Sequence, residues 1–206
     1  MRIGIDFDNT IVDYNSLVYD ISTRNNLINK GFDKDKKKIK ESLILKGKEI
    51  EWRNIQSLIY GKEIFKAKLF NNFTDFIMES RKKNYFLQIV SHKTEFSNLT
   101  RKNPNLREMA IAWMKKNEFF SKLGFKLSDI HFESTREEKI KLINSIGFDY
   151  FIDDLEEVFL NKKWSKNIKP ILLNKELKEK SKNIMLCNSW KKINKFFFKK
   201  ETWLTL

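Results

Sequence analysis

Short apolar runs that end in polar residues recur along the chain, and stretches of helical periodicity separate them. Such runs predict strands, and their alternation with helices is typical of an α/β fold with a parallel sheet. The expected strands lie at residues 2–8, 85–91, 129–132, 149–152 and 169–173. Helical periodicity covers residues 106–123, 136–146 and 190–198. The pattern therefore predicts a Rossmann-like α/β core of three layers, in which helices cover a parallel sheet.

One stretch, residues 15–68, interrupts this alternation because it contains no convincing strand. It holds helix-like segments at residues 17–27, 34–48 and 51–60, and glycines punctuate them. We therefore expect a small all-helical insertion at residues 15–68, after the first strand. The core would then consist of residues 1–14 and 69–206.

Polar side chains stand at the carboxyl ends of three predicted strands. Asp6 and Asp8 end the first, Ser91 ends the second, and Asp153 and Asp154 follow the fourth. The ligand site of a parallel sheet forms just beyond the carboxyl ends of its strands. We therefore expect these side chains to gather at one edge of the sheet.

The first two aspartates have a spacing that suits phosphoryl transfer. Residues i and i+2 of a strand share a face and lie about 7 Å apart, so Asp6 and Asp8 could bracket one phosphoryl group. Asp6 would attack phosphorus and form an aspartyl-phosphate. Asp8 would protonate the leaving oxygen and then deprotonate the water that hydrolyses the intermediate.

Two carboxylates beside a phosphate dianion repel one another, so this arrangement needs a cation. Mg²⁺ prefers oxygen ligands and binds one or two carboxylates together with substrate phosphate. Asp153 and Asp154 would supply the further ligand. Lys139 and Ser91 could neutralise and hydrogen-bond the phosphoryl oxygens.

These segments together resemble the four motifs of the haloacid dehalogenase (HAD) superfamily. The matching segments are Asp6-Phe7-Asp8-Asn9-Thr10, Ile89-Val90-Ser91, Lys139 and Ile152-Asp153-Asp154. The resemblance implies that Asp6 is the nucleophile and a metal ligand, and that Asp8 is the acid and base whose backbone carbonyl also touches the metal. It assigns Ser91 and Lys139 to the substrate phosphate and the acidic pair to Mg²⁺. Thr10 would steady the loop, and we include Asn9 and Thr10 among the residues expected around the phosphate.

The helical insertion at residues 15–68 lies where this superfamily places its first type of cap. Such a cap is a lid over the site, and it favours small substrates. The expected function is a Mg²⁺-dependent phosphatase for a small phosphorylated metabolite, such as a sugar or polyol phosphate. The alternatives are a nucleotidase or nucleic-acid end phosphatase on the same fold, and a non-catalytic binding module. The module would be expected to lack Asp6 or Asp8, and the chain has both.

The net charge of +14 makes nucleic acid a candidate partner. Only seven of the 41 cationic residues are arginine, however, and nucleic-acid recognition usually relies on arginine forks. A solvated lysine surface is therefore the preferred interpretation. No apolar run approaches the roughly 18 residues that span a bilayer, so we expect no membrane partner. A single cysteine, Cys187, and an N-terminus without room for a signal peptide favour a cytoplasmic protein.

Several assignments stay open in the sequence. Lys141 competes with Lys139 for the phosphate-binding position. Asp153 and Asp154 would point to opposite sides of a strand, and the resemblance favours Asp154 as the direct metal ligand. Glu157 could belong to the site or to the first turn of the next helix.

Overall fold

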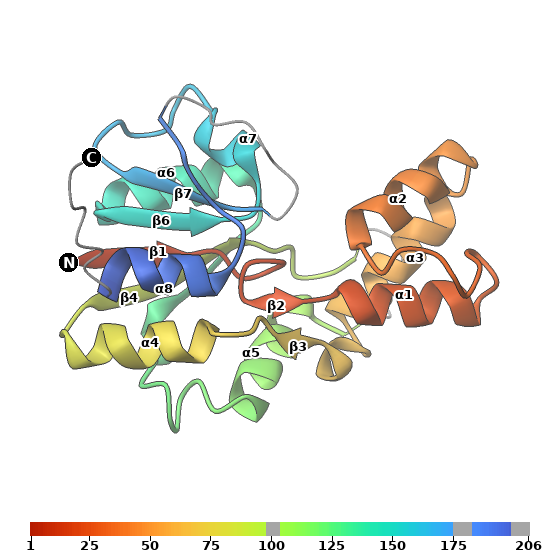
Figure 1. The fold of residues 1–206 in the computed structure, drawn as a ribbon, viewed down its shortest axis with the longest axis horizontal. Helices are drawn as coiled ribbons and strands as arrows, with labels where there is room; N and C mark the ends of the chain where they lie inside the picture. The colour runs from red at the N-terminus through yellow and green to blue at the C-terminus, as the bar shows by residue number, and fades with distance from the viewer. Residues whose placement is uncertain (98–103, 175–182, 199–206) are drawn as a thin grey trace, which may run out of the picture. The chain divides into compact units, whose positions relative to one another are not determined.

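The computed structural model describes residues 1–97, 104–174 and 183–198 (Figure 1). The chain divides into two compact units. The first contains residues 1–11, 69–92 and 120–206, and the second contains residues 12–68 and 93–119.

A parallel sheet of six strands forms the centre of the first unit, counting the residues that the structure describes. Across the sheet its strands are β5 (Ile130–Glu133), β4 (Phe86–His92), β1 (Arg2–Ile5), β6 (Tyr150–Asp153), β7 (Lys169–Leu173) and β8 (Met185–Cys187). All neighbours pair in parallel. The predicted α/β fold class is confirmed, and so are the five predicted strands. The first strand is shorter than expected, because it ends at Ile5 and not at residue 8.

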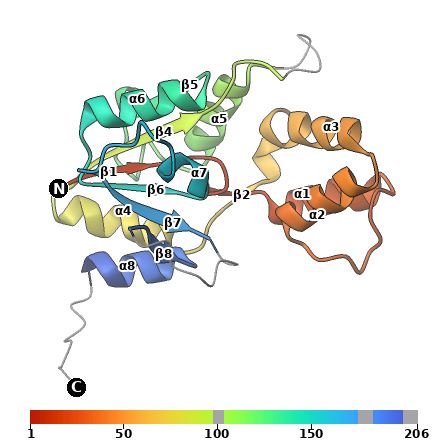
Figure 2. The same cartoon turned by 90° about the horizontal axis from the view of Figure 1, so that it is seen from above.

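Helices cover both faces of this sheet (Figure 2). One face carries α4 (Phe73–Lys82) and α8 (Trp190–Phe198), which contact each other. The other face carries α6 (Arg136–Ile146), which contacts β4 and β5. A short helix, α7 (Glu156–Phe159), follows β6, and a 3-10 turn, η2 (Leu127–Asp129), precedes β5. In the described part of the chain, no helix combines the length and apolar character needed to cross a membrane.

The central strand β1 contains a glycine, Gly4, where two aromatic rings need space. Gly4 pairs with Phe151 of β6. A Cβ atom on Gly4 would lie only 2.4 Å from a Phe151 ring carbon and 2.8 Å from a Phe148 ring carbon. Glycine thus leaves room for both rings beneath the strand. On either side of it, Ile3 and Ile5 are fully buried, which anchors the strand that leads to Asp6.

Helix α6 begins directly after β5 because its first turn is capped. The Thr135 hydroxyl accepts a hydrogen bond from the Glu138 backbone N–H at 3.1 Å, and the Thr135 N–H donates to the Glu138 carboxylate at 3.0 Å. This reciprocal capping box satisfies two N–H groups that the helix itself leaves unpaired. The helix ends at Ile146, and Gly147 after it has a left-handed φ of 68°. The cap fixes the point at which α6 leaves the carboxyl edge of the sheet.

The second unit is mainly helical. Its elements are β2 (Val12–Asp13), α1 (Asn15–Arg24), α2 (Lys36–Leu45), α3 (Glu49–Tyr60), η1 (Ile64–Lys66) and α5 (Leu106–Lys116). Helices α1, α2 and α3 contact one another. A short strand, β3 (Lys68–Leu69), pairs with β2 where the chain passes between the units.

Helix α5 also belongs to the second unit, together with residues 12–68. It packs on η1 and α3. Its Trp113 is fully buried, and the indole N–H donates a hydrogen bond to the Ala67 carbonyl at 3.1 Å. The predicted helix over residues 106–123 is too long, because the chain turns at Glu118, where φ is 60°.

Candidate active site

The sheet order brings together three strands whose ends carry polar side chains. Strand β1 lies between β4 and β6. The Asp6 N–H donates to the Ile152 carbonyl at 2.9 Å, so the ladder between β1 and β6 continues one residue beyond β1. Ser91 lies near the end of β4, and Asp153 is the last residue of β6. Asp6, Ser91 and Asp153 therefore meet at the carboxyl edge of the sheet, as predicted for a parallel sheet.

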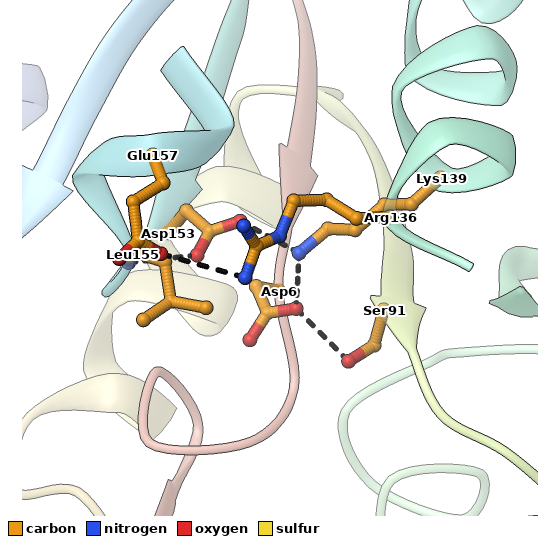
Figure 3. A network of polar contacts seen from close by, with 7 residues as sticks. All are labelled: Asp6, Ser91, Arg136, Lys139, Asp153, Leu155 and Glu157. Carbon is orange, nitrogen blue, oxygen red and sulfur yellow. Dashed lines mark hydrogen bonds and ion pairs between the residues drawn. The ribbon is translucent and has the colours of Figure 1, made fainter. Parts of the chain in front are cut away.

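Lys139 of α6 holds two of these carboxylates (Figure 3). Its Nζ donates to Asp6 Oδ1 at 2.6 Å and to Asp153 Oδ2 at 2.6 Å. The Ser91 hydroxyl donates to the same Asp6 oxygen at 2.9 Å. All four side chains are buried, whereas Lys141 is exposed on the same helix. The structure thus brings Lys139 into the cluster and leaves Lys141 on the surface.

The charges in this cluster are not balanced. Burial raises the pKa of Asp6 to about 6; Lys139 acts against this shift, and the nearby Asp153 and Asp8 add to it. Burial alone would lower the pKa of Lys139, but Asp153 and Asp6 outweigh it and hold that pKa above its usual range. A single buried ammonium thus faces two carboxylates, and burial disfavours the ionised form of one of them, Asp6. A further cation would therefore be stabilised at this edge.

Three carboxylates could hold such a cation. Ligand oxygens of Asp6, Asp153 and Asp154 all lie within 4.8 Å of one another. Mg²⁺ binds oxygen at 2.0–2.1 Å, so two of its ligands lie at most about 4.2 Å apart, and a small inward movement would suffice. Strand alternation predicted opposite sides for Asp153 and Asp154. It does not apply, because β6 ends at Asp153.

The position of Asp8 does not follow from strand alternation either. We expected Asp6 and Asp8 to share a face of one strand, but β1 ends at Ile5. The next residues turn instead, and the Ile11 N–H donates to the Phe7 carbonyl at 2.9 Å. Asp8 is partly buried, and its charge contributes to the raised pKa of Asp6. The turn therefore keeps Asp8 near Asp6.

The same turn contains Asn9 and Thr10, which we expected near the phosphate. Asn9 has a left-handed φ of 61°, a conformation that asparagine adopts more readily than most residues. Thr10 is fully buried, and its hydroxyl has no hydrogen-bond partner among the described residues. The Thr10 carbonyl accepts a hydrogen bond from the Trp190 indole N–H at 2.8 Å. Thr10 is thus placed to support the turn.

Sequence reasoning missed one cation beside the cluster. Arg136 forms an ion pair with Glu157, with Nη2 and Oε2 3.4 Å apart (Figure 3). One signal was available, because Arg136 precedes Lys139 by three residues, and side chains at that spacing share a helix face. Sequence spacing could not predict Glu157 as the ion-pair partner of Arg136, because Glu157 lies on a different helix.

Comparison with known proteins identifies the fold. No protein-family model matches the chain, and no curated protein matches it. Among solved structures, a family IA HAD hydrolase from Entamoeba histolytica aligns with a TM-score of 0.54 at 13% identity, over 93% of this chain and 94% of that one. A HAD-superfamily hydrolase from Ehrlichia chaffeensis aligns with a TM-score of 0.49 at 14% identity, over 95% and 94%. The first of these two alignments shows that the chain has the fold of the HAD hydrolases, which confirms the resemblance at the level of the fold.

Proposed function

We propose that this protein is a Mg²⁺-dependent phosphatase that forms a phospho-aspartate on Asp6. The observation that carries the proposal is the setting of Asp6. Its carboxylate is buried and accepts hydrogen bonds from Ser91 and Lys139, and its oxygens approach those of Asp153 and Asp154. A nucleophilic carboxylate needs this combination of fixed orientation and nearby positive charge.

The contacts of Asp6 suggest how it would act. Both hydrogen bonds end on Oδ1, so we assign Oδ2 as the oxygen that forms the new bond to phosphorus. As that bond forms, the ester P–O bond breaks, and Asp8 donates a proton to the leaving oxygen. Asp8 then removes a proton from a water molecule that attacks phosphorus. Inorganic phosphate leaves, and the Asp6 carboxylate is restored.

Asp153 and Asp154 would have different roles in the site. Both oxygens of Asp153 have protein partners, because Oδ2 accepts from Lys139 and Oδ1 accepts from the Leu155 N–H at 3.0 Å. We therefore assign Asp154 and Asp6 as direct Mg²⁺ ligands, together with the Asp8 backbone carbonyl, and Asp153 as the residue that orients Lys139. When bound, Mg²⁺ would neutralise charge between the carboxylates and the phosphoryl oxygens.

The substrate we propose is a small phosphorylated metabolite, such as a sugar or polyol phosphate. The helical segment at residues 15–68 would act as a lid that excludes larger substrates, and residues 1–14 and 69–206 would form the catalytic core. The net charge of +14 keeps a nucleotidase or nucleic-acid end phosphatase as the second candidate. Steep salt-dependent binding to oligonucleotides would favour the second candidate.

A phosphate-release screen tests the proposal. The purified protein would be incubated with Mg²⁺ and a panel of sugar, polyol and nucleoside phosphates, with Asp6→Asn as the matched variant. We expect release from some of these compounds, loss of release in Asp6→Asn and loss on chelation of the metal. Absence of release from every compound, or full activity in Asp6→Asn, would reject the proposal.

A further inference from the structure

The Arg136–Glu157 ion pair crosses the edge of the sheet at which the proposed nucleophile lies. Arg136 is the first residue of α6, which follows β5, and Glu157 is in the first turn of α7, which follows β6. The two strands between β5 and β6 are β4 and β1, which lead to Ser91 and Asp6. The pair therefore spans the carboxyl ends of the strands that form the site (Figure 3).

Arg136 faces the same region as Lys139 but is more accessible. The two lie three residues apart on α6, so their side chains share a face of the helix. The Lys139 side chain is only 2% exposed, whereas that of Arg136 is 44% exposed. Burial lowers the pKa of His92, at the end of β4, and the charges of Lys139 and Arg136 both lower it further. Both cations therefore act on the end of the same strand.

The charge at this edge calls for a second cation from the protein. Four carboxylates lie in and beside the cluster: Asp6, Asp8, Asp153 and Asp154. One lysine and one Mg²⁺ would not neutralise them together with a phosphate dianion. The hydrogen bonds of Lys139 already go to Asp6 and Asp153. Arg136 carries five N–H donors in a planar fork, which matches two oxygens of one phosphoryl group.

We propose that Arg136 binds the phosphoryl group of the substrate, and that Glu157 holds Arg136 across the site until substrate arrives. This inference rests on the proposed phosphatase function. The Glu157 side chain is 66% exposed, and exposed ion pairs contribute little stability, so an incoming phosphate can displace it. Bidentate, charge-assisted hydrogen bonds to phosphate are stronger than such a pair.

Binding of inorganic phosphate tests the inference without relying on turnover. Calorimetric titration in the presence of Mg²⁺ would compare the wild type with Arg136→Ala, Arg136→Lys and Glu157→Gln. Lys141→Ala is the matched control, because it removes an exposed cation from the same helix. We expect Arg136→Ala to weaken phosphate binding about 10- to 100-fold, since hydrogen bonds to charged groups are lost. Arg136→Lys should restore only part of this loss, Glu157→Gln should bind phosphate more tightly, and Lys141→Ala should resemble the wild type.

Two results of the binding experiment would overturn the inference. If Arg136→Ala bound phosphate as tightly as Lys141→Ala, Arg136 would not bind the phosphoryl group. If Glu157→Gln bound phosphate as tightly as the wild type, Glu157 would not hold Arg136 across the site. If Arg136→Ala did not fold, as judged by circular dichroism, Arg136→Lys and Arg136→Gln would decide the point. A wild type that releases no phosphate from any metabolite refutes the proposed function. An active wild type whose KM is unchanged by Arg136→Ala refutes this inference alone.

Discussion

The indole N–H of Trp190 donates a hydrogen bond to the backbone carbonyl of Thr10 at 2.8 Å, across 180 residues of sequence. Trp190 is the first residue of α8 and is 1% exposed. Its ring packs against Phe73 and Phe76 of α4, with ring centroids 5.1 Å and 5.0 Å apart. The contact ties α8 and α4 to the turn that follows Asp6.

Substitution of Trp190 by phenylalanine should therefore affect both stability and activity. The change keeps an aromatic ring but leaves the buried Thr10 carbonyl without its donor, which costs about 1–3 kcal/mol. We expect a lower free energy of unfolding in urea and a lower kcat, because the turn that carries Asp8 loses support. Trp164→Phe is the control, since that indole also donates to a carbonyl, Ile168, but away from the turn. An unchanged kcat in Trp190→Phe would show that α8 does not support the turn.

Lys139 should matter more for stability than a surface lysine. Lys139→Met keeps much of the side-chain length but leaves two buried carboxylates without their shared cation, and removal of one partner of a buried pair costs about 3–5 kcal/mol. We expect a large fall in the free energy of unfolding and loss of phosphate release. Lys141→Met should change stability by less than about 0.5 kcal/mol. Equal effects of the two substitutions would contradict the assignment of Lys139 to the cluster.

The raised pKa of Asp6 predicts a pH dependence in the metal-free protein. The carboxyl keeps its proton up to about pH 6 when folded but loses it near 3.8 when unfolded. The folded state then binds more protons, so stability falls as pH rises through this window. Relative to Asp6→Asn, the wild type should lose about 2 kcal/mol of unfolding free energy between pH 4.5 and 7.5. The raised pKa of Lys139 adds no slope here, because its contribution is complete below pH 10.5.

Chemical denaturation of both proteins in a chelator would measure this difference. Addition of Mg²⁺ should flatten the wild-type curve, since a nearby dication favours the ionised carboxylate. Parallel pH curves for the wild type and Asp6→Asn without metal would show that burial does not raise the pKa of Asp6.

The main strands could be read from the sequence because they are apolar on both faces. The adjacent residues Phe151 and Ile152 of β6, and Ile89 and Val90 of β4, are all fully buried, and such runs are typical of central parallel strands. Strands β2, β3 and β8 have only two or three residues, too few to show a period. The end of α5 was missed because Glu118, not glycine, adopts the left-handed conformation there.

The edge at which the site lies was also predictable, but its details were not. Parallel topology alone places Asp6, Ser91 and Asp153 together. The alternation of side chains between the two faces, however, holds only inside a strand. It fails for Asp8 because the chain turns after β1 ends. The contact of Trp190 with Thr10 depends on how two distant segments pack, and no local pattern encodes it.

The most direct test of the account is to find the phosphoryl group on Asp6. Asp8→Asn should still accept a phosphoryl group from a good substrate but hydrolyse the intermediate slowly, because no base activates water. After a single turnover quenched in acid, mass spectrometry of peptides should find one phosphoryl group, located on Asp6. Two outcomes would contradict the account if the wild type releases phosphate. Either neither protein carries a phosphoryl group on Asp6, or the group is found on another residue.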